Sequence, residues 1–167
     1  MTQNWFEQRL HPDPLCRVVL VEPLIPENTG NISRTCVGTG SELHLVGPLG
    51  FEITEARVRR AGLDYWGDLA WKTHENYAEW RKTVPDPSRV FLIETTGTKS
   101  LYDTEFRRGD WLVFGKETSG LAPSILAEFD ASAYHLPMPG TTRSLNLSNA
   151  VAISVFELLR QTQHIRK

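Results

Sequence analysis

Residues 17–46 read RVVLVEPLIPENTGNISRTCVGTGSELHLV, and this stretch decides the fold class. Its first five residues, 17–21, form a β-branched run that is typical of a buried strand. Residues 22–30 contain two prolines and a glycine and predict a loop. A short helix is expected over 31–37, where nearby glycines end it, and a second strand over 43–46. A strand, a helix and a second strand in this order favour an α/β fold.

The same alternation continues along the chain. Further strands are expected over 89–93, 111–114 and 134–138. Helical segments are expected over 54–61, 74–83 and 121–129. The last helix is the clearest, because four apolar residues share one helical face: Val151, Val155, Leu158 and Leu159. We therefore expect a mainly parallel sheet flanked by helices, with ligands bound where the loops after the strands meet at one edge.

Length and composition exclude several classes of protein. The 167 residues predict one domain over 15–167 after an extension of residues 1–14. The 18 Lys and Arg against 20 Asp and Glu give a net charge of −2, which disfavours nucleic-acid binding through bulk positive charge. Cys16 and Cys36 lie in no CxxC motif, so two reduced cysteines in a cytoplasmic protein are expected. No membrane span and no signal peptide are expected.

The loop after the first strand carries polar residues suited to a binding site. Residues 26–34 read PENTGNISR. Asn28 and Thr29 are suited to cap the following helix, and Gly30 permits a close backbone approach. Arg34 lies about one helical turn after Gly30, so it can face a molecule that the loop holds. The alternative is a plain strand, turn and helix with a solvated arginine.

Two later loops are also rich in polar residues. Residues 114–121, FGKETSGL, have the glycine spacing of a P-loop, but Leu121 stands where that motif requires lysine. A nucleoside triphosphate site is therefore not predicted. Residues 136–149, LPMPGTTRSLNLSN, place five polar side chains before the last helix: Arg143, Ser144, Asn146, Ser148 and Asn149. Helix capping explains one or two of them, and hydrogen bonds to a polar small molecule would explain more.

Taken together, these stretches resemble the TrmH-like 2′-O-ribose methyltransferases of the knotted SPOUT superfamily. The resemblance is strongest to the short, single-domain group that methylates the wobble nucleotide of tRNA. The matching segments lie in family order within 17–161: they are 22–32, 59–65, 114–121 and 143–150. The resemblance implies a C-terminal trefoil knot, a homodimer and S-adenosylmethionine as the methyl donor, with no metal.

The resemblance also implies roles for individual residues. The implied cofactor-binding residues are Ile93, Glu94, Gly115, Leu136, Met138, Ser144 and Leu145. The implied substrate-binding residues are Asn28, Asn31, Arg57, Arg59, Arg60 and Arg143. The implied catalytic residues are Arg34, Glu117, Ser144 and Asn149.

The chemistry narrows the roles of three of these residues. A guanidinium has a pKa above about 12, so Arg34 is expected to stabilise the developing alkoxide or to orient the adjacent phosphate, not to act as a base. Glu117 is expected either to take the proton or to position Arg34 through a bidentate pair. Asn149 is expected either to orient substrate or cofactor, or to cap the last helix.

The expected substrate is the ribose 2′-OH of nucleotide 34, a cytidine or modified uridine, in the anticodon loop of tRNA. The basic cluster of Arg57, Arg59 and Arg60 is expected to meet the RNA. Tyr65 and Trp66 are expected to stack on a splayed base, or else to pack in the core or in the dimer. Two alternatives remain: a 2′-O-methyltransferase that acts on rRNA or at another tRNA position, and a non-catalytic RNA-binding dimer of the same fold.

Overall fold

A computed structural model of the chain describes residues 13–53, 64–129 and 133–162. Its strands are β1 (Cys16–Val21), β2 (Glu42–Val46), β3 (Trp71–His74), β4 (Val90–Ile93), β5 (Lys99–Ser100), β6 (Asp110–Phe114) and β7 (Ala133–His135). Its α-helices are α1 (Pro26–Thr39), α3 (Tyr77–Lys82), α4 (Pro123–Glu128) and α5 (Leu147–Thr162). Short 3-10 helices are η2 (Asp64–Asp68), η3 (Pro87–Arg89) and η4 (Leu101–Asp103).

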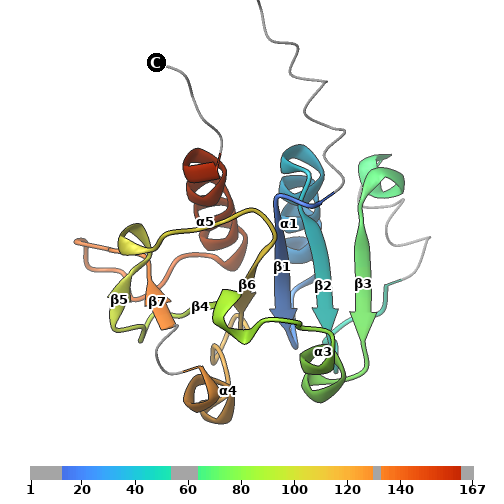
Figure 1. Cartoon of the computed structure of the whole chain (residues 1–167). Helices are drawn as coiled ribbons and strands as arrows, with labels where there is room; N and C mark the ends of the chain where they lie inside the picture. The colour runs from blue at the N-terminus through green and yellow to red at the C-terminus, as the bar shows by residue number, and fades with distance from the viewer. Residues whose placement is uncertain (1–12, 54–63, 130–132, 163–167) are drawn as a thin grey trace, which may run out of the picture.

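The described strands form one sheet in the order β3-β2-β1-β6-β4-β7-β5, and every neighbouring pair is parallel (Figure 1). Strands β2 and β3 follow β1 in the chain and lie on one side of it in the sheet. Strands β4 and β6 come later in the chain and lie on the other side, with β6 next to β1. Ligands bind in the crevice beside such a change of direction. The expected α/β class with a parallel sheet is confirmed.

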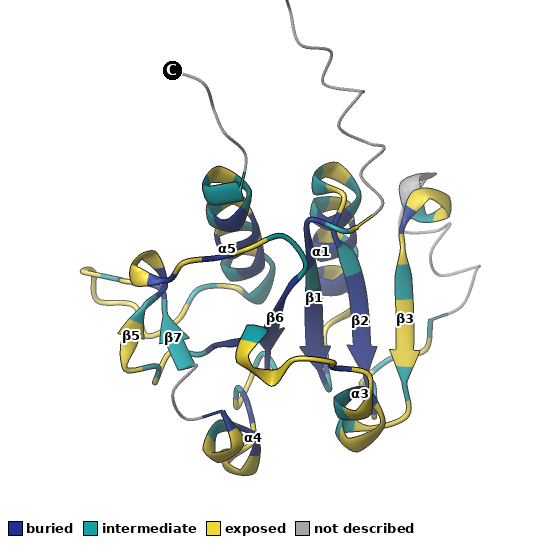
Figure 2. Cartoon of the chain, viewed as in Figure 1, coloured by how far each residue is buried: buried dark blue, intermediate teal, exposed yellow. Residues whose placement is uncertain are grey.

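The side chains of the central strands alternate between two buried cores. Val18 and Leu20 of β1 face one core, whereas Val19 and Val21 face the other. Helices α1 and α5 cover the first face, and α3 and α4 cover the second (Figure 1). The strands at the centre of the sheet are therefore buried on both sides, as Figure 2 shows by their dark blue colour.

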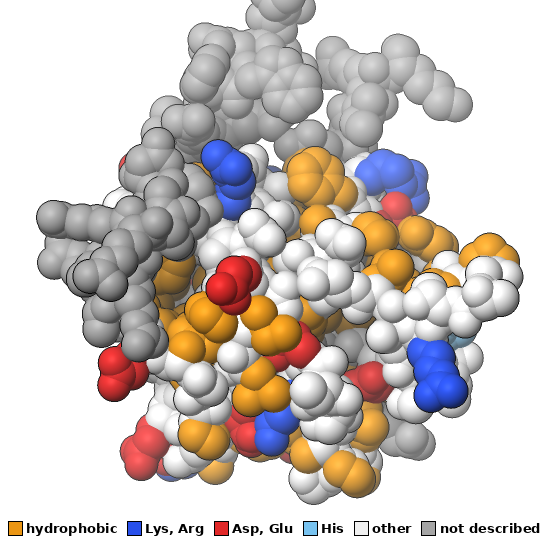
Figure 3. Space-filling model, turned by 180° about the vertical axis from the view of Figure 1, so that it is seen from behind, with side chains coloured by type: hydrophobic (Ala, Val, Ile, Leu, Met, Phe, Trp, Pro, Cys, Tyr) orange, Lys and Arg blue, Asp and Glu red, His pale blue; other side chains and the backbone are white. Residues whose placement is uncertain are grey.

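The apolar face predicted for the last helix is confirmed. Val151, Val155 and Leu158 are completely buried, and Leu159 packs beside them. The opposite side of α5 also carries apolar residues. Ile153 is 38% exposed and Phe156 is 56% exposed. From behind the sheet, on the side of α1 and α5, apolar side chains reach the surface among charged ones (Figure 3).

Several element boundaries differ from the sequence prediction, and strands β3 and β5 were not predicted. Helix α1 begins at Pro26 instead of residue 31, because proline has the backbone angle of a first helical residue and needs no N–H partner there. Strand β7 ends at His135, because Pro137 provides no N–H to continue the ladder. Strand β3 was not predicted: it is an edge strand with no fully buried residue and no apolar alternation. The helix expected over 54–61 lies outside the described residues.

The two cysteines are free, as the sequence predicted, and the structure buries both. The Cys16 Sγ atom lies 3.3 Å from the hydroxyl of Ser41. Burial raises the pKa of the Cys16 thiol to about 12, and it also raises the pKa of Cys36 well above its usual value. Because a thiolate is the reactive form, both cysteines are packing residues at neutral pH.

Candidate active site

A cleft of about 740 Å³ lies at the carboxyl edge of the sheet. The loops after β4, β6 and β7 line it, together with the first turns of α1 and α5. Its volume lies within the range of about 300–1,000 Å³ that is typical of small-molecule sites. The cleft therefore forms where the parallel sheet predicts a ligand site.

The cleft brings together residues that are far apart in the sequence. All seven residues expected to bind a cofactor line it: Ile93, Glu94, Gly115, Leu136, Met138, Ser144 and Leu145. Asn28, Glu117 and Arg143 line it as well. Cleft residues that the sequence analysis did not single out as site residues include Thr95, Thr96 and Ser119. Their short polar side chains gave no signal beyond that of an ordinary loop.

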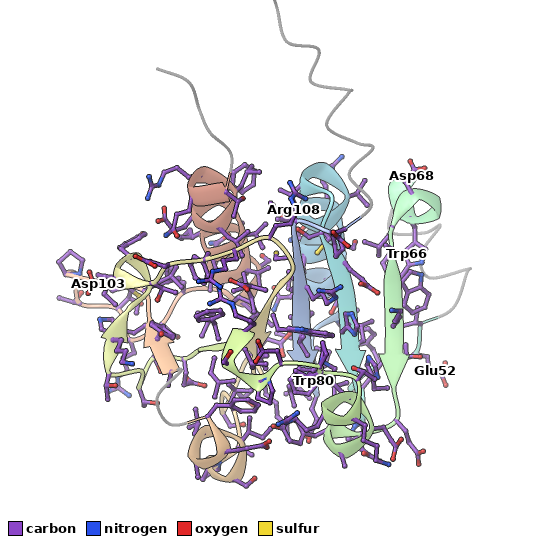
Figure 4. All side chains as sticks on the ribbon, viewed as in Figure 1. Glu52, Trp66, Asp68, Trp80, Asp103 and Arg108 are labelled. Carbon is purple, nitrogen blue, oxygen red and sulfur yellow. The ribbon has the colours of Figure 1, made fainter. Side chains whose placement is uncertain are left out.

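Other predicted site residues lie apart from the cleft lining. Asn31 and Arg34 are exposed on α1 and do not line the cleft. Asn149 is exposed in the first turn of α5 and does not line it either. The basic cluster of Arg57, Arg59 and Arg60 lies outside the described residues. Trp66 packs against Trp71 of β3, with the ring centroids 5.3 Å apart, at the edge of the sheet (Figure 4).

The loop between Gly115 and Gly120 is closed by backbone contact. The N–H of Gly120 donates to the carbonyl of Lys116 at 2.9 Å, and the N–H of Lys116 donates back to Gly120 at 3.2 Å. A Cβ atom on Gly115 would lie 2.1 Å from the Gly120 carbonyl carbon, which no real side chain tolerates. Gly120 has a φ of +67°, the left-handed region that favours glycine. The two glycines of the FGKETSGL motif are therefore needed for this turn.

Glu94 ties the loop after β4 to the loop after β6. Its carboxylate accepts hydrogen bonds from the Thr95 N–H at 2.8 Å, from the Thr95 hydroxyl at 3.1 Å and from the Leu121 N–H at 2.8 Å. A Cβ atom on Gly120 would lie 2.2 Å from the same carboxylate. Glycine at position 120 therefore leaves the space that the Glu94 side chain occupies.

Glu117 holds the start of α1. Its carboxylate accepts hydrogen bonds from the N–H groups of Leu24 at 2.9 Å and Ile25 at 3.1 Å, and from the Asn28 side-chain amide at 3.2 Å. Partial burial opposes ionisation of Glu117, but these hydrogen bonds outweigh it and lower the pKa of the carboxyl. Glu117 is therefore a carboxylate at neutral pH, beside the positive end of the helix dipole.

The capping role predicted for Asn28 and Thr29 is wrong. The N-cap residue of α1 is Ile25, which has no side-chain cap, and both polar residues lie buried inside the first turn. Proline at position 26 starts the helix earlier than expected and moves them inside it. The Glu117 carboxylate, from a loop about 90 residues away, instead accepts the hydrogen bonds of the N–H groups at this end.

Asn146 joins the starts of α1 and α5. Its side-chain amide donates to the Asn28 side-chain oxygen at 3.0 Å. Its own side-chain oxygen accepts from the N–H of Ser148 at 2.9 Å and from the Ser148 hydroxyl at 2.6 Å. Asn146 thus caps α5, whereas Asn149 lies within the first turn and does not. A continuous hydrogen-bond chain from Glu117 through Asn28 to Asn146 joins two loops to the first turn of α1.

The side chains that line the cleft are suited to bind and orient a ligand. Among its described lining residues there is no histidine and no cysteine, two residue types that often act as a general base or a nucleophile. Within the described part of the chain, no group of three or more His, Cys, Asp or Glu residues is arranged to hold a metal ion. The cationic side chains on the lining are Lys116 and Arg143. The cleft is suited to hold a polar small molecule beside an anionic partner.

Comparison with known proteins places the chain among RNA methylases. The model of the SpoU rRNA methylase family matches residues 16–156. A tRNA (cytidine(34)-2′-O)-methyltransferase of Burkholderia pseudomallei is 49% identical over 86% of this chain and 94% of its own length. The enzyme of the same name from Escherichia coli is 43% identical over 88% of this chain and 94% of its own length.

A solved structure agrees with these sequence relatives. It is described by the words "Structural insights into the 2-OH methylation of C/U34 on tRNA". It superposes with a TM-score of 0.83 at 40% identity, over 95% of this chain and 98% of that chain. The fold and the order of the site loops are therefore shared over nearly the full length of both proteins.

Proposed function

This chain belongs to the SpoU rRNA methylase family, and from that premise we propose that it methylates the ribose 2′-OH of nucleotide 34 in tRNA. Relatives that carry this activity in their names match it over most of both chains. The observation that carries the proposal is the cleft, where all seven residues expected to bind the cofactor come together from three loops. The proposed substrate is the anticodon loop with cytidine or a modified uridine at that position, in the cytoplasm.

The cleft suits S-adenosylmethionine as the methyl donor. Ile93, Leu136 and Leu145 offer apolar contact for a flat base. Hydroxyl and amide groups of Thr95, Ser144 and other lining residues offer hydrogen bonds for a ribose and an amino-acid group. When bound, S-adenosylmethionine supplies a methyl group that its sulfonium already activates. The protein then has to orient the acceptor oxygen and stabilise its charge.

We assign the charge-stabilising role to Arg34. Its guanidinium stays protonated, so it is suited to stabilise the oxyanion that develops on the ribose or to hold the neighbouring phosphate. Glu117 positions α1, the helix that carries Arg34 and Asn28. The lowered pKa of Glu117 makes it a weak base, which favours this positioning role over removal of the proton. Ser144 and Arg143, on the third loop, are assigned to orient cofactor and RNA.

The proposed assembly is a homodimer with RNA bound across both subunits. Ile153 and Phe156 on the outer side of α5 form an apolar surface that a second copy would cover. No helix within the described residues is long and apolar enough to cross a membrane. Arg57, Arg59 and Arg60 remain proposed RNA contacts.

The test is methyl transfer from labelled S-adenosylmethionine into total tRNA, with nuclease mapping of the product. A 2′-O-methylated nucleotide 34 that is lost with Arg34→Ala supports the proposal and the role of that residue. Transfer to another tRNA position or to rRNA would contradict the assigned substrate and leave the methyltransferase activity. Cofactor binding without any transfer would favour a non-catalytic RNA-binding dimer.

A further inference from the structure

Glu22 holds a backbone conformation that side chains disfavour. It follows β1 directly and has a φ of +52°, the left-handed region that glycine adopts most easily. No other described residue except glycine has a positive φ. Its N–H donates to the carbonyl of Val46 at 2.7 Å, which fixes the backbone there. A residue with a side chain at such a position suggests that the side chain itself has a task.

The partner of the Glu22 side chain is Lys116. The Lys116 Nζ atom lies 2.5 Å from the Glu22 Oε2 atom. The two side chains are 36% and 32% exposed, so solvent and a binding partner reach both. The backbone of Lys116 is pinned by its two hydrogen bonds to Gly120, which leaves its long side chain as the part that can move. The pair therefore joins the end of β1 to the loop that lines the cleft.

Lys116 is one of few positive charges that the cleft offers to a polyanion. The Glu94 and Glu117 carboxylates on the lining are already satisfied by N–H and hydroxyl donors. Lys116 and Arg143 are the cations on the described lining. Because the whole chain carries a net charge of −2, RNA has to find local positive charge at the cleft.

Another anion can easily replace Glu22 as the partner of Lys116. A partly exposed ion pair contributes little stability and is screened by salt. A lysine ammonium is a point charge on a flexible stem, and phosphate is a strong acceptor for it. A phosphate that arrives beside the cleft is thus able to replace the Glu22 carboxylate without breaking the fold.

We propose that Lys116 is a substrate-positioning residue that binds a backbone phosphate of the RNA, and that Glu22 holds its ammonium at the cleft until the phosphate displaces it. This inference rests on the proposed function, because it takes RNA to be the substrate. Glu22 then has two opposing effects on RNA binding. Glu22 keeps Lys116 close to the cleft, and it competes with the phosphate for the same charge.

The test compares tRNA binding of the full-length variants Lys116→Gln and Glu22→Gln over a range of salt concentrations, with S-adenosylhomocysteine present. Lys116→Gln is expected to weaken binding severalfold and to reduce the salt slope by about 0.7 to 1. Glu22→Gln is expected to tighten binding, because removal of the competing carboxylate outweighs loss of the contact that keeps Lys116 close to the cleft. Lys116→Arg is expected to retain the wild-type slope. The controls are Lys82→Gln and Glu79→Gln, which break a surface pair on α3 with a similar distance of 2.6 Å.

Two results would overturn the inference. One is a Lys116→Gln variant that binds with the affinity and salt slope of Lys82→Gln. The other is weaker binding by Lys116→Gln and Glu22→Gln alike, accompanied by equal losses of melting temperature, which is the behaviour of a purely structural pair. The binding comparison needs no turnover. Failure of the wild-type protein to methylate nucleotide 34 would therefore contradict the proposed function separately.

Discussion

His44 is a buried polar residue whose surroundings keep it neutral. Its Nδ1 atom lies 2.9 Å from the Nε2 atom of His74, and its ring lies edge-on to Trp111 with centroids 4.9 Å apart. The pKa of His44 is lowered to about 4, mainly by burial, with smaller contributions from His74 and Lys72 and against the opposing effect of Glu42. The protein therefore folds around an uncharged imidazole.

We predict that the free energy of unfolding falls as the pH drops from about 6.5 to about 4. The unfolded chain binds a proton at this histidine near pH 6.5, whereas the folded chain resists it until about pH 4, so acid favours unfolding. The loss that His44 causes amounts to about 3 kcal/mol at most. Denaturant titrations at several pH values measure it. The substitution His44→Phe should flatten the profile in this window, and an unchanged profile would contradict the assignment.

At Gly120, the addition of a single Cβ atom is expected to affect both cofactor binding and stability. We predict that Gly120→Ala weakens S-adenosylmethionine binding at least tenfold and costs about 1–3 kcal/mol of stability. An added Cβ atom would lie 2.2 Å from the Glu94 carboxylate, and the φ of +67° is strained for alanine. Calorimetric titration and thermal unfolding measure the two effects.

Gly38→Ala is the matched control for that substitution. Gly38 lies in α1 with no atom within 4 Å of an added Cβ, so alanine should stabilise the helix by about 0.5–1 kcal/mol. Cofactor binding should stay unchanged in this variant. If the two variants bound S-adenosylmethionine equally well and were equally stable, the space around Glu94 would not determine cofactor binding.

At the scale of elements, the starts of α1 and α5 form one unit. Glu117 binds the N–H groups before α1, Asn28 of α1 donates to Glu117, and Asn146 before α5 donates to Asn28. A shift of either helix would break a hydrogen bond inside the cleft. The two helices also pack against each other along the sheet. The geometry of the site thus depends on how both helices begin.

We predict that Asn146→Ala lowers stability by about 1 kcal/mol and lowers kcat for methyl transfer more than tenfold. The substitution removes the cap of α5 and leaves the Asn28 side-chain oxygen without the donor from the third loop. Thermal unfolding and single-turnover transfer measure the two effects. Asn149→Ala is the comparison, because Asn149 is exposed within α5 and should change stability by less than about 0.5 kcal/mol. A larger loss of activity for Asn149→Ala than for Asn146→Ala would support the catalytic role that the sequence predicts for Asn149.

At the scale of the whole molecule, the outer side of α5 is the surface offered to a second copy. Ile153 and Phe156 lie three positions apart, so they are neighbours on the helix surface. The side of α5 opposite to them fills the core. A helix that is apolar on both sides is typically buried on both sides, which supports the proposed homodimer.

We predict that Phe156→Asp converts the proposed dimer to monomers and reduces methyl transfer, because a charge cannot be buried unpaired at an apolar interface. Sedimentation velocity measures the change in mass. The control is Tyr102→Asp, which places the same charge at an aromatic residue that is 53% exposed on η4. This control should remain dimeric. A monomeric wild-type protein would refute the homodimer, and a dimeric Phe156→Asp variant would place the interface elsewhere.

Local sequence patterns were enough to predict the central strands, the last helix and the loops of the site. The β-branched run of β1 and the apolar spacing of α5 are local patterns, and both predict their elements correctly because burial on a sheet or helix face imposes a fixed period. The three polar loops were also identified from sequence, and all three line the cleft. The trefoil knot and the roles of the individual site residues stay predictions.

The partner of each polar side chain in the site became known only from the folded structure. Glu117 binds the N–H groups just before α1, a helix about 90 residues earlier in the chain, and Asn146 joins α5 to α1. Glu22 meets Lys116 because β1 and β6 are neighbours in the sheet, although they are far apart in the chain. A hydrogen bond or ion pair depends on distances of about 3 Å between atoms, and such distances between remote segments are set by packing of the whole sheet and its helices.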